Sequence, residues 1–320
     1  MPARNIVVIG SINMDLVCRC PRMPERGETL AATSDLLTIP GGKGANQAVA
    51  AARLAGPQDR VHMIGRVGDD DFGQRLLVGL RGHKVHTEHV TVTEAAGTGC
   101  ALILVDKAGE NSIVVSPGAN ARLTPADIDA AADLLARASV VLMQLEIPAP
   151  TVAHAIRLCR RSGARVILDP APVPAKGLSR ALYQVDVLTP NQTEAQALLA
   201  KPTAAMGRMR RTRQADAKQL GQELLERGPG VVILKLGAKG SMLFDNEIAH
   251  LKGKRVRVVD TTAAGDAFNG ALAVALAEGM ELPRAVRFAN AAGAKACETF
   301  GAQPALPTRM DVEALLEGMH

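Results

Sequence analysis

One aspartate stands where a predicted helix begins, in the string Asp260-Thr-Thr-Ala-Ala-Gly-Asp-Ala-Phe-Asn-Gly270. Small residues leave four backbone N–H groups free at that helix end, those of Ala263, Ala264, Gly265 and Asp266. A helix N-terminus carries about half a positive elementary charge and binds phosphate. A carboxylate at such a site would repel the phosphate, so Asp266 is expected to have a separate role. It could accept a proton from an attacking hydroxyl group. An anion-binding turn beside a base is what phosphoryl transfer requires, although an acidic residue is also common in a first helical turn.

Two further strings place glycines, donors and a carboxylate where a polyol could bind. Gly41-Gly-Lys-Gly-Ala-Asn-Gln-Ala48 leads into a predicted helix but lacks the spacing of a Walker A loop. Its glycines allow close backbone approach to a ligand, and Lys43 and Asn46 supply donors for hydroxyl groups. Asp15 ends the string Gly10-Ser-Ile-Asn-Met-Asp15 after the first predicted strand, and ligands bind open α/β sheets at such strand ends. A helix-capping turn and a surface turn are the alternatives.

Two strings in the second half of the chain suit a nucleotide and its metal. In Thr189-Pro-Asn-Gln-Thr-Glu194, Asn191 and Glu194 are three residues apart and share a helix face. The carboxylate there can hold Mg²⁺ through water, and a plain helix N-cap by Asn191 is the alternative. Lys235-Leu-Gly-Ala-Lys-Gly240 is a glycine-bearing turn after a strand, which can lie along a nucleotide.

The elements that must position these strings alternate along the chain. Continuous apolar runs predict strands buried on both faces, at 6–10, 61–66, 140–144, 166–169, 185–189 and 231–235. Helical patterns lie between and after them, at 45–54, 72–80, 125–136, 151–161, 193–199, 215–227, 266–277, 282–298 and beyond 309. A β-rich run at 256–259 precedes the helix that carries Asp266. The alternation predicts an α/β fold with βαβ units and a mostly parallel sheet.

Two stretches without helices of their own break this alternation, at 16–38 and 98–116. The second holds two β-rich runs around Asp106-Lys-Ala-Gly-Glu-Asn111, a good hairpin turn. We expect both stretches to form a small sheet across one end of the main one, as a lid. A third segment, 201–218, is rich in Lys and Arg, and either an anion-binding patch or a solvated insertion accounts for it.

Composition limits the classes of function. The 320 residues are 47% hydrophobic, enough for a full core, but only 2% aromatic with no Trp, which disfavours single-stranded nucleic acid binding. The net charge of +5 suits an anionic ligand without specifying one. Because no apolar run resembles a signal peptide or a membrane span, we expect a soluble, cytoplasmic protein. The first strand is not followed by G-x-G-x-x-G, which argues against a dinucleotide-dependent oxidoreductase.

The cysteines do not form a disulfide framework, because they are odd in number and scattered: Cys18, Cys20, Cys100, Cys159 and Cys297. Cys18 and Cys20 are two residues apart and would share one face of a strand, as two metal ligands could. No second Cys or His pair follows at a suitable spacing. We expect structural thiols, with a metal site as the alternative.

Taken in order, these strings resemble those of the PfkB carbohydrate kinases. G-G-K-G-A-N-Q-A, T-P-N-x-T-E and D-T-x-A-A-G-D-x-F-N-G carry the resemblance, and intermediate strings extend it over nearly the whole chain: Pro117-Gly-Ala-Asn120, Met143-Gln-Leu-Glu146 and Gly301-Ala-Gln-Pro304. The resemblance implies a ribokinase-like three-layer α/β/α fold in a single domain, 1–320. A mostly parallel central sheet would carry a small antiparallel β lid formed by segments 14–40 and 98–117.

The resemblance also implies the reaction, in which ATP phosphorylates O5 of D-ribose, with Asp266 as the general base and residues 263–266 as the anion hole. The sugar would be held by Asn13, Met14, Asp15, Gly42, Lys43, Gly44, Ala45, Asn46, Glu146 and Asp266. Glu194 would also place Mg²⁺. The ATP site would be lined by Asn191, Glu194, Lys235, Leu236, Gly237, Ala238, Lys239, Gly240, Gly265 and Asn290.

Members of the family bind a monovalent cation, usually K⁺, and commonly dimerise by packing their lids together. The matching cation positions are Asp260, Thr262, Ala296, Thr299, Gly301 and Ala305. The last position is often Ser, whose hydroxyl is a ligand, so Ala305 implies K⁺ activation that is weaker or completed by water. The resemblance implies a homodimer and neither a nucleic-acid nor a membrane partner.

Few side chains separate ribose from related substrates, so a kinase for 2-deoxyribose, another furanose or a nucleoside is the alternative. A catalytically silent sugar or nucleotide sensor on the same fold is less favoured, because a binding protein has no use for the Asp266 base.

Overall fold

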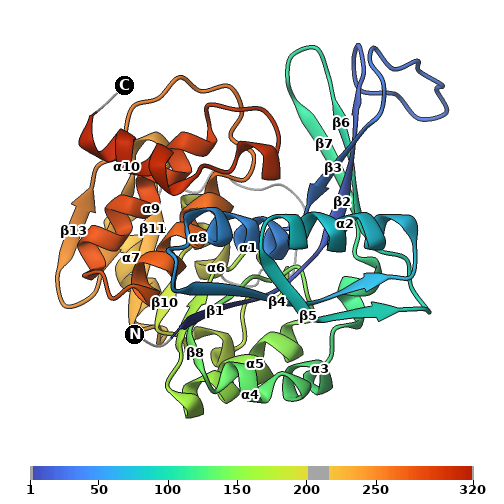
Figure 1. The fold of residues 1–320 in the computed structure, drawn as a ribbon. Helices are drawn as coiled ribbons and strands as arrows, with labels where there is room; N and C mark the ends of the chain where they lie inside the picture. The colour runs from blue at the N-terminus through green and yellow to red at the C-terminus, as the bar shows by residue number, and fades with distance from the viewer. Residues whose placement is uncertain (1–2, 201–215, 319–320) are drawn as a thin grey trace.

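A nine-stranded sheet forms the centre of the molecule (Figure 1), which we describe from a computed structural model that covers residues 3–200 and 216–318. Its strands are β1 (Arg4–Ile9), β4 (Asp59–Gly68), β5 (Val85–Thr93), β8 (Ala138–Met143), β9 (Arg165–Leu168), β10 (Val187–Leu188), β11 (Val231–Lys235), β12 (Ser241–Phe244) and β13 (Ile248–Leu251). The order is β13-β12-β11-β10-β9-β8-β1-β4-β5. Neighbours from β5 to β11 run parallel, and β12 and β13 add an antiparallel edge.

Helices cover both faces of this sheet. One face carries α1 (Lys43–Leu54), α2 (Asp71–Gly82), α8 (Ala264–Ala277), α9 (Leu282–Ala296) and α10 (Arg309–Glu317). The other carries α3 (Pro125–Ala130), α4 (Ala132–Leu135), α5 (Ala149–Ser162), α6 (Gln192–Leu199) and α7 (Ala217–Leu225). Along β1, Ile6 and Val8 enter the first core while Val7 and Ile9 enter the second, so every position is apolar. The predicted three-layer α/β/α fold is confirmed.

A smaller four-stranded sheet projects from one end of the main sheet (Figure 1). It is formed by β2 (Asn13–Arg19), β3 (Leu37–Gly41), β6 (Gly99–Val105) and β7 (Asn111–Ser116), in the order β3-β2-β6-β7. The predicted hairpin joins β6 to β7, and its Asp106 carboxylate accepts hydrogen bonds from two N–H groups of the turn. The two outer pairings are antiparallel, but β2 and β6 are parallel because the chain passes through the main sheet between them.

Several local expectations differ from the structure. The helix expected at 125–136 is divided at Ala131 into α3 and α4, and the β-rich run 256–259 forms no strand, with Val258 and Val259 exposed. Strands β5, β12 and β13 were not predicted: β5 and β13 are the two edge strands and carry polar residues, and β12 is only four residues long. Most of the basic segment 201–218 lies outside the described residues. Within the described ranges, no helix is both long and apolar enough to cross a bilayer.

Candidate active site

Asp266 lies in the first turn of α8, at an open helix N-terminus. Ala263 precedes the helix with a φ of 58°, a left-handed conformation that is strained for a residue with a Cβ, and no side chain caps the helix. The N–H of Ala264 donates to the carbonyl of Thr261 at 3.3 Å, so one of the four predicted free donors is in use. The N–H groups of Gly265 and Asp266 meet no acceptor among residues 3–200 and 216–318. This end keeps donors and a positive dipole for an anion.

The Asp266 carboxylate is buried, since only 6% of the residue is exposed. Asn46 Nδ2 donates to one carboxylate oxygen at 3.0 Å, and Gln47 Nε2 donates to the other at 2.9 Å. Burial raises the pKa of Asp266 to about 6, against the opposing effect of the nearby Lys43 ammonium. A carboxyl group that titrates near neutral pH can both take up and release a proton, as a general base must.

Glycines allow α1 to begin directly against the end of β1. Gly42 precedes the helix with a φ of 86°, and a Cβ on it would lie 2.7 Å from the backbone nitrogen of Asn13. A Cβ on Gly44 would lie 2.6 Å from the carbonyl carbon of Gly10. Any larger residue would therefore push the helix away from the sheet. The close approach is what carries Asn46 to the Asp266 carboxylate.

Glu146 follows β8 and ties the glycine string to β1. The Ser11 hydroxyl and the Lys43 backbone N–H both donate to its Oε2, at 2.5 and 3.1 Å. Burial lowers the pKa of the Lys43 ammonium, but four nearby carboxylates raise it by more: Asp266, Asp169, Glu146 and Glu194. Lys43 therefore stays positively charged among these acidic side chains.

Asn13 and Asp15 lie on β2, where the smaller sheet meets the main one. The Asp15 carboxylate covers Gly41, because a Cβ on that glycine would lie 2.2 Å from Asp15 Oδ2. Burial and two neighbouring carboxylates raise the pKa of Asp15 to about 7. Asn13 Oδ1 accepts a hydrogen bond from Asn120 Nδ2 at 2.7 Å. Met14 lies between them and packs into the apolar core, as side-chain alternation along a strand requires.

A buried chain of polar groups extends from Asp266 across the sheet. Gln47 Nε2 donates both to Asp266 Oδ1 and, at 3.0 Å, to Asp169 Oδ2. Gln144 Nε2 donates to Gln47 Oε1 at 2.6 Å and so fixes which way the Gln47 amide faces. The sequence strings include both glutamines without assigning them a role. Asp169 was not assigned a role, although its place as the last residue of a predicted strand was the available signal.

Lys235 forms the far end of this polar chain. Its Nζ donates to Asp169 Oδ1 at 3.0 Å, in an ion pair with little exposure on either side. The same Nζ lies 3.7 Å from the position that a Cβ on Gly265 would occupy. A cation therefore stands beside the free N–H groups of α8, and it is held there by a buried carboxylate.

Asn191 and Glu194 form a reciprocal cap on α6. Asn191 Oδ1 accepts from the Glu194 N–H, while the Glu194 carboxylate accepts from the backbone and side-chain amides of Asn191, all at 2.8 Å. The helix cap that the sequence left as an alternative is therefore present. Because Mg²⁺ keeps much of its hydration, such an ion near this helix would meet the carboxylate mainly through water.

The turn after β11 and the helix α9 meet at the end of β13. Gly237–Lys239 is an exposed 3₁₀ turn, and Gly240 follows with a φ of 88°. A Cβ on Gly240 would lie 2.1 Å from the Leu251 carbonyl oxygen, to which Asn290 Nδ2 donates at 3.1 Å. The sequence-predicted nucleotide residues of these two segments therefore lie close together.

Comparison with known proteins agrees with this geometry. The model of the pfkB family of carbohydrate kinases matches residues 3–309. The chain belongs to this family. The ribokinase of Bacillus subtilis is 40% identical over 314 residues, which span 98% of this chain and 99% of that protein. The ribokinase of Mus musculus is 34% identical over 320 residues, with 98% and 95% covered.

Solved structures of similar pfkB-family proteins agree over the whole fold. The crystal structure of Thermotoga maritima ribokinase has a TM-score of 0.85 and 37% identity, covering 98% of this chain and 99% of that one. The structure of Arabidopsis thaliana ribokinase complexed with ribose and ATP has a TM-score of 0.85 and 32% identity, with 99% of each chain covered.

The loop before α8 holds some of the residues that the sequence predicts to bind a monovalent cation. Asp260 Oδ1 accepts from the N–H and the hydroxyl of Thr262, at 2.9 and 2.7 Å, and its Oδ2 accepts from the Gly301 N–H at 2.9 Å. Burial alone would raise the pKa of Asp260, but these hydrogen bonds outweigh it and lower the pKa. The other predicted members lie at the end of α9 and in the segment after it: Ala296, Thr299 and Ala305.

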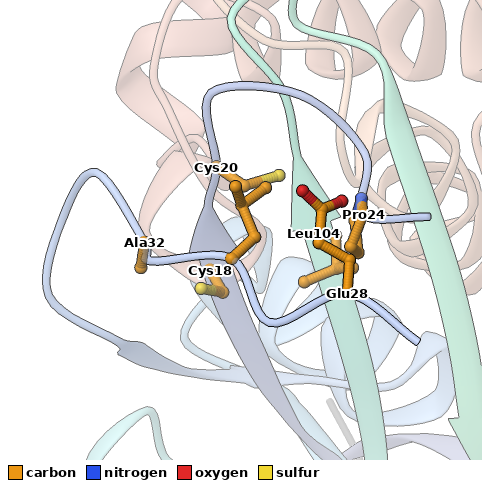
Figure 2. Close-up of a pocket in the computed structure, with 7 residues that line it drawn as sticks. Cys18, Cys20, Pro24, Glu28, Ala32 and Leu104 are labelled. Atoms are coloured by element: carbon orange, nitrogen blue, oxygen red, sulfur yellow. The ribbon is translucent and has the colours of Figure 1, made fainter. Parts of the chain in front are cut away.

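The two neighbouring cysteines lie in the smaller sheet of this pfkB-family chain, beside a hollow of about 210 Å³ (Figure 2). Their sulfur atoms turn away from each other in Figure 2, and Cys20 Sγ donates to the Val105 carbonyl at 3.6 Å. The Glu28 carboxylate in the same hollow is paired with Arg22 at 2.8 Å. In the described part of the chain, no third ligand atom groups closely with Cys18 and Cys20. This geometry favours structural thiols over a metal site.

Proposed function

We propose that the chain is an ATP-dependent ribokinase, which phosphorylates O5 of D-ribose to give D-ribose 5-phosphate. The observation that carries this proposal is Asp266, a buried carboxyl group with a pKa of about 6 beside free N–H groups at the start of α8. Relatives named ribokinase that align over their full length support ribose as the sugar, and the Arabidopsis relative was solved with ribose and ATP.

In this reaction Asp266 accepts the proton of the sugar's 5-hydroxyl as that oxygen attacks the γ-phosphorus of ATP. A bond forms between O5 and the γ-phosphorus, and the bond from that phosphorus to the β–γ bridging oxygen breaks, so that ADP leaves. The N–H groups of Gly265 and Asp266, with the Lys235 ammonium, stabilise the charge on the transferring group. Asn46 and Gln47 hold the base in one orientation throughout.

The sugar binds, in this proposal, at the junction of β2 and α1. Asp15 is well suited to bind two hydroxyl groups, because its carboxylate accepts no hydrogen bond from the described residues. Lys43 supplies a cation and donors beside it. The remaining sugar contacts are Asn13, Gly42, Gly44, Ala45, Asn46 and Glu146. The ATP site uses the turn 235–240 together with Asn191, Gly265 and Asn290.

The residues present fit two metal ions. Mg²⁺ would lie near Glu194 and the phosphates and would be held mainly through water, because this ion gives up its hydration reluctantly. K⁺ would lie beside the anion hole, within the loop that Asp260 ties to Thr262 and Gly301. Its other ligands would be mostly backbone carbonyls, because Ala296 and Ala305 have no side-chain oxygen. Bound Mg²⁺ would neutralise phosphate charge, and K⁺ would support the geometry of this loop.

The chain acts, in our proposal, as a single domain whose smaller sheet closes over the sugar and pairs with that of a second copy. Five large apolar side chains in or directly before the strands of this sheet are at least half exposed: Leu36, Leu102, Ile113, Val114 and Val115. Exposed apolar surface of this kind is typical of an interface. A homodimer through the lid would cover it. Analytical ultracentrifugation of the wild type and of Val114→Asp tests this proposal. We expect the wild type to sediment as a dimer and the variant as a monomer.

We place the reaction in the cytoplasm. All five cysteines are free, including the partly exposed Cys18, Cys100 and Cys297. Free thiols persist where the surroundings are reducing. The proposed phosphoryl donor, ATP, is also present in the cytoplasm.

A panel of sugars with coupled detection of ADP, run with and without K⁺, tests the proposed function. D-ribose is expected to give the highest kcat/KM, and 2-deoxyribose a lower one because the groups that bind the 2-hydroxyl are left unpaired. If fructose or a nucleoside exceeds ribose by about tenfold or more, the substrate assignment is wrong. If no alcohol is phosphorylated while ATP and sugar both bind, the chain is a sensor.

A further inference from the structure

Three side chains that the proposed reaction does not use converge at the outer edge of the main sheet. His62 on β4 is the register partner of His86 on β5, and β5 is the last strand on that side. Glu88 follows His86 by two residues and so lies on the same face of β5. One donor atom from each of the three side chains lies within 4.8 Å of the other two. The strand pairing therefore brings two imidazoles and a carboxylate together.

The immediate surroundings orient the His62 imidazole. The rings of His62 and His86 stack with centroids 4.7 Å apart and an interplanar angle of 23°. Asn5 Oδ1 lies 3.3 Å from His62 Nε2, which is the kind of second partner that orients a metal-binding histidine. Glu88 Oε1 lies 3.3 Å from His86 Nδ1.

We propose that His62, His86 and Glu88 bind a divalent transition-metal ion of the zinc class. Two imidazoles and one carboxylate are a donor set that Zn²⁺, Co²⁺ and Ni²⁺ accept, with water completing the coordination. Hard Mg²⁺ and Ca²⁺ prefer all-oxygen sites and are excluded by the same donors. The site is independent of the proposed sugar kinase activity.

Binding requires a small rearrangement that the site allows. A tetrahedral ion with bonds of about 2.0–2.1 Å needs ligand atoms about 3.3 Å apart, whereas the donor atoms are here within 4.8 Å of one another in stacked rings. The two rings must therefore tilt out of their stack and the donors must approach one another. The His86 and Glu88 side chains are 39% and 67% exposed, so they can turn without disturbing either core. His62, which is half-buried, stays as the fixed member.

The position of the site predicts what a bound ion does. His62 is the fourth residue of β4, near the amino end of the strand, whereas the catalytic groups lie beyond the carboxyl ends of the strands. An ion that joins β4 to β5 binds the folded chain and not the unfolded one, so it raises the unfolding temperature by mass action. It leaves kcat unchanged.

Titration of the tag-free, metal-free full chain with Co²⁺, without nucleotide, tests the proposal by visible absorption. We expect one equivalent to bind with the d–d bands of a nitrogen and oxygen site. His86→Ala should weaken binding by more than the about 10–100-fold that is typical of losing an outer-shell partner. Glu88→Gln, an exposed and nearly isosteric change, should also weaken it. His154→Ala is the matched control, because that histidine pairs with Asp129 elsewhere on the surface, and it should bind as the wild type does.

A second readout is the unfolding temperature with and without Zn²⁺, which should rise for the wild type and His154→Ala but not for His86→Ala. Circular dichroism establishes that each variant is folded. An intense near-ultraviolet thiolate charge-transfer band would place the ion on the cysteines and overturn the proposal. Equal Co²⁺ affinity in His86→Ala and His154→Ala would overturn it as well, as would the absence of saturable binding. None of these outcomes depends on whether the chain phosphorylates ribose.

Discussion

Two helices begin near the carboxyl ends of the strands, and their first turns differ in one respect. At α6, Asn191 and Glu194 satisfy each other's donors and acceptors in a complete capping box. At α8, the residue before the helix is a left-handed alanine without a capping side chain, and the first turn holds a buried aspartate. The free N–H groups of a helix end need partners. The α6 end, the closed end, has a side-chain acceptor for the Glu194 N–H, whereas the α8 end, the open end, has no side-chain cap.

Replacing the acid at each helix end gives the largest test of this contrast. Asp266→Asn is expected to lower kcat by about 10²–10⁴-fold, the range that a general base contributes, while ATP binding is largely kept. Coupled ADP detection measures kcat, and calorimetry measures ATP binding. The comparison variant is Glu194→Gln, which changes an acid in the first turn of the capped helix and is expected to lower kcat less, because Glu194 acts only through the hydrated Mg²⁺. Equal losses of kcat in the two variants would remove the distinction between the open and the closed end.

The polar chain that reaches the open end is the next target. Asp169→Asn leaves Lys235 without its buried counter-ion, and breaking a buried pair in this way is expected to cost about 3 kcal/mol of the free energy of unfolding. Urea denaturation measures this cost. In the double variant with Lys235→Met, no charge is left unpaired, so part of the loss should be recovered. Additive losses would show that the two side chains do not act as a pair.

The same polar chain shows what the sequence could and could not reveal. Asp266, Lys43 and Asn46 lie in contiguous strings, so their residue types and spacing were enough to predict them. Asp169 and Gln47 act through a contact between segments 122 residues apart, which no local pattern encodes.

The fold also has parts that the sequence could predict and parts that it could not. Buried strands such as β1 and β8 were predicted from continuous apolar runs, whereas β5 and β13 were missed because an edge strand tolerates polar residues. The parallel pairing of β2 with β6 also depends on where the chain returns after the main sheet. Helix α8 starts two residues before its predicted start, because Ala263 and not a capping side chain sets the boundary.

The pH dependence of kcat tests the open end without a mutation. Asp266 must be ionised to accept a proton, and burial raises its pKa to about 6. Because kcat reports the pKa of Asp266 in the complex with both substrates, kcat should be constant above that pKa and fall about tenfold for each pH unit below it. Asp15, with a pKa of about 7, is expected to act on the KM for the sugar, so kcat isolates the base. A kcat that stays constant down to pH 4 would exclude Asp266 as the group that must lose its proton.

The cap at the closed end makes a smaller contribution, which is to stability. Asn191→Ala removes an N-cap and is expected to lower the free energy of unfolding by about 1 kcal/mol. Asn191→Ser restores a side chain that caps equally well and should recover most of that loss. A serine variant that is stable but has a raised KM for ATP would support the proposed contact of Asn191 with the nucleotide, and an unchanged KM would argue against that contact.

The smallest effect concerns the strain at the open end. Ala263 is held at a φ of 58°, a conformation that costs an alanine roughly 1–2 kcal/mol and a glycine almost nothing. Part of that gain is lost because glycine makes the unfolded chain more flexible. Ala263→Gly is therefore expected to raise the free energy of unfolding by less than about 1 kcal/mol, measured by urea denaturation. A simultaneous fall in kcat would show that the strained alanine holds the free N–H groups in the position that the transferring phosphoryl group needs. A loss of stability would mean that the turn is relaxed and that the two helix ends differ only in their capping.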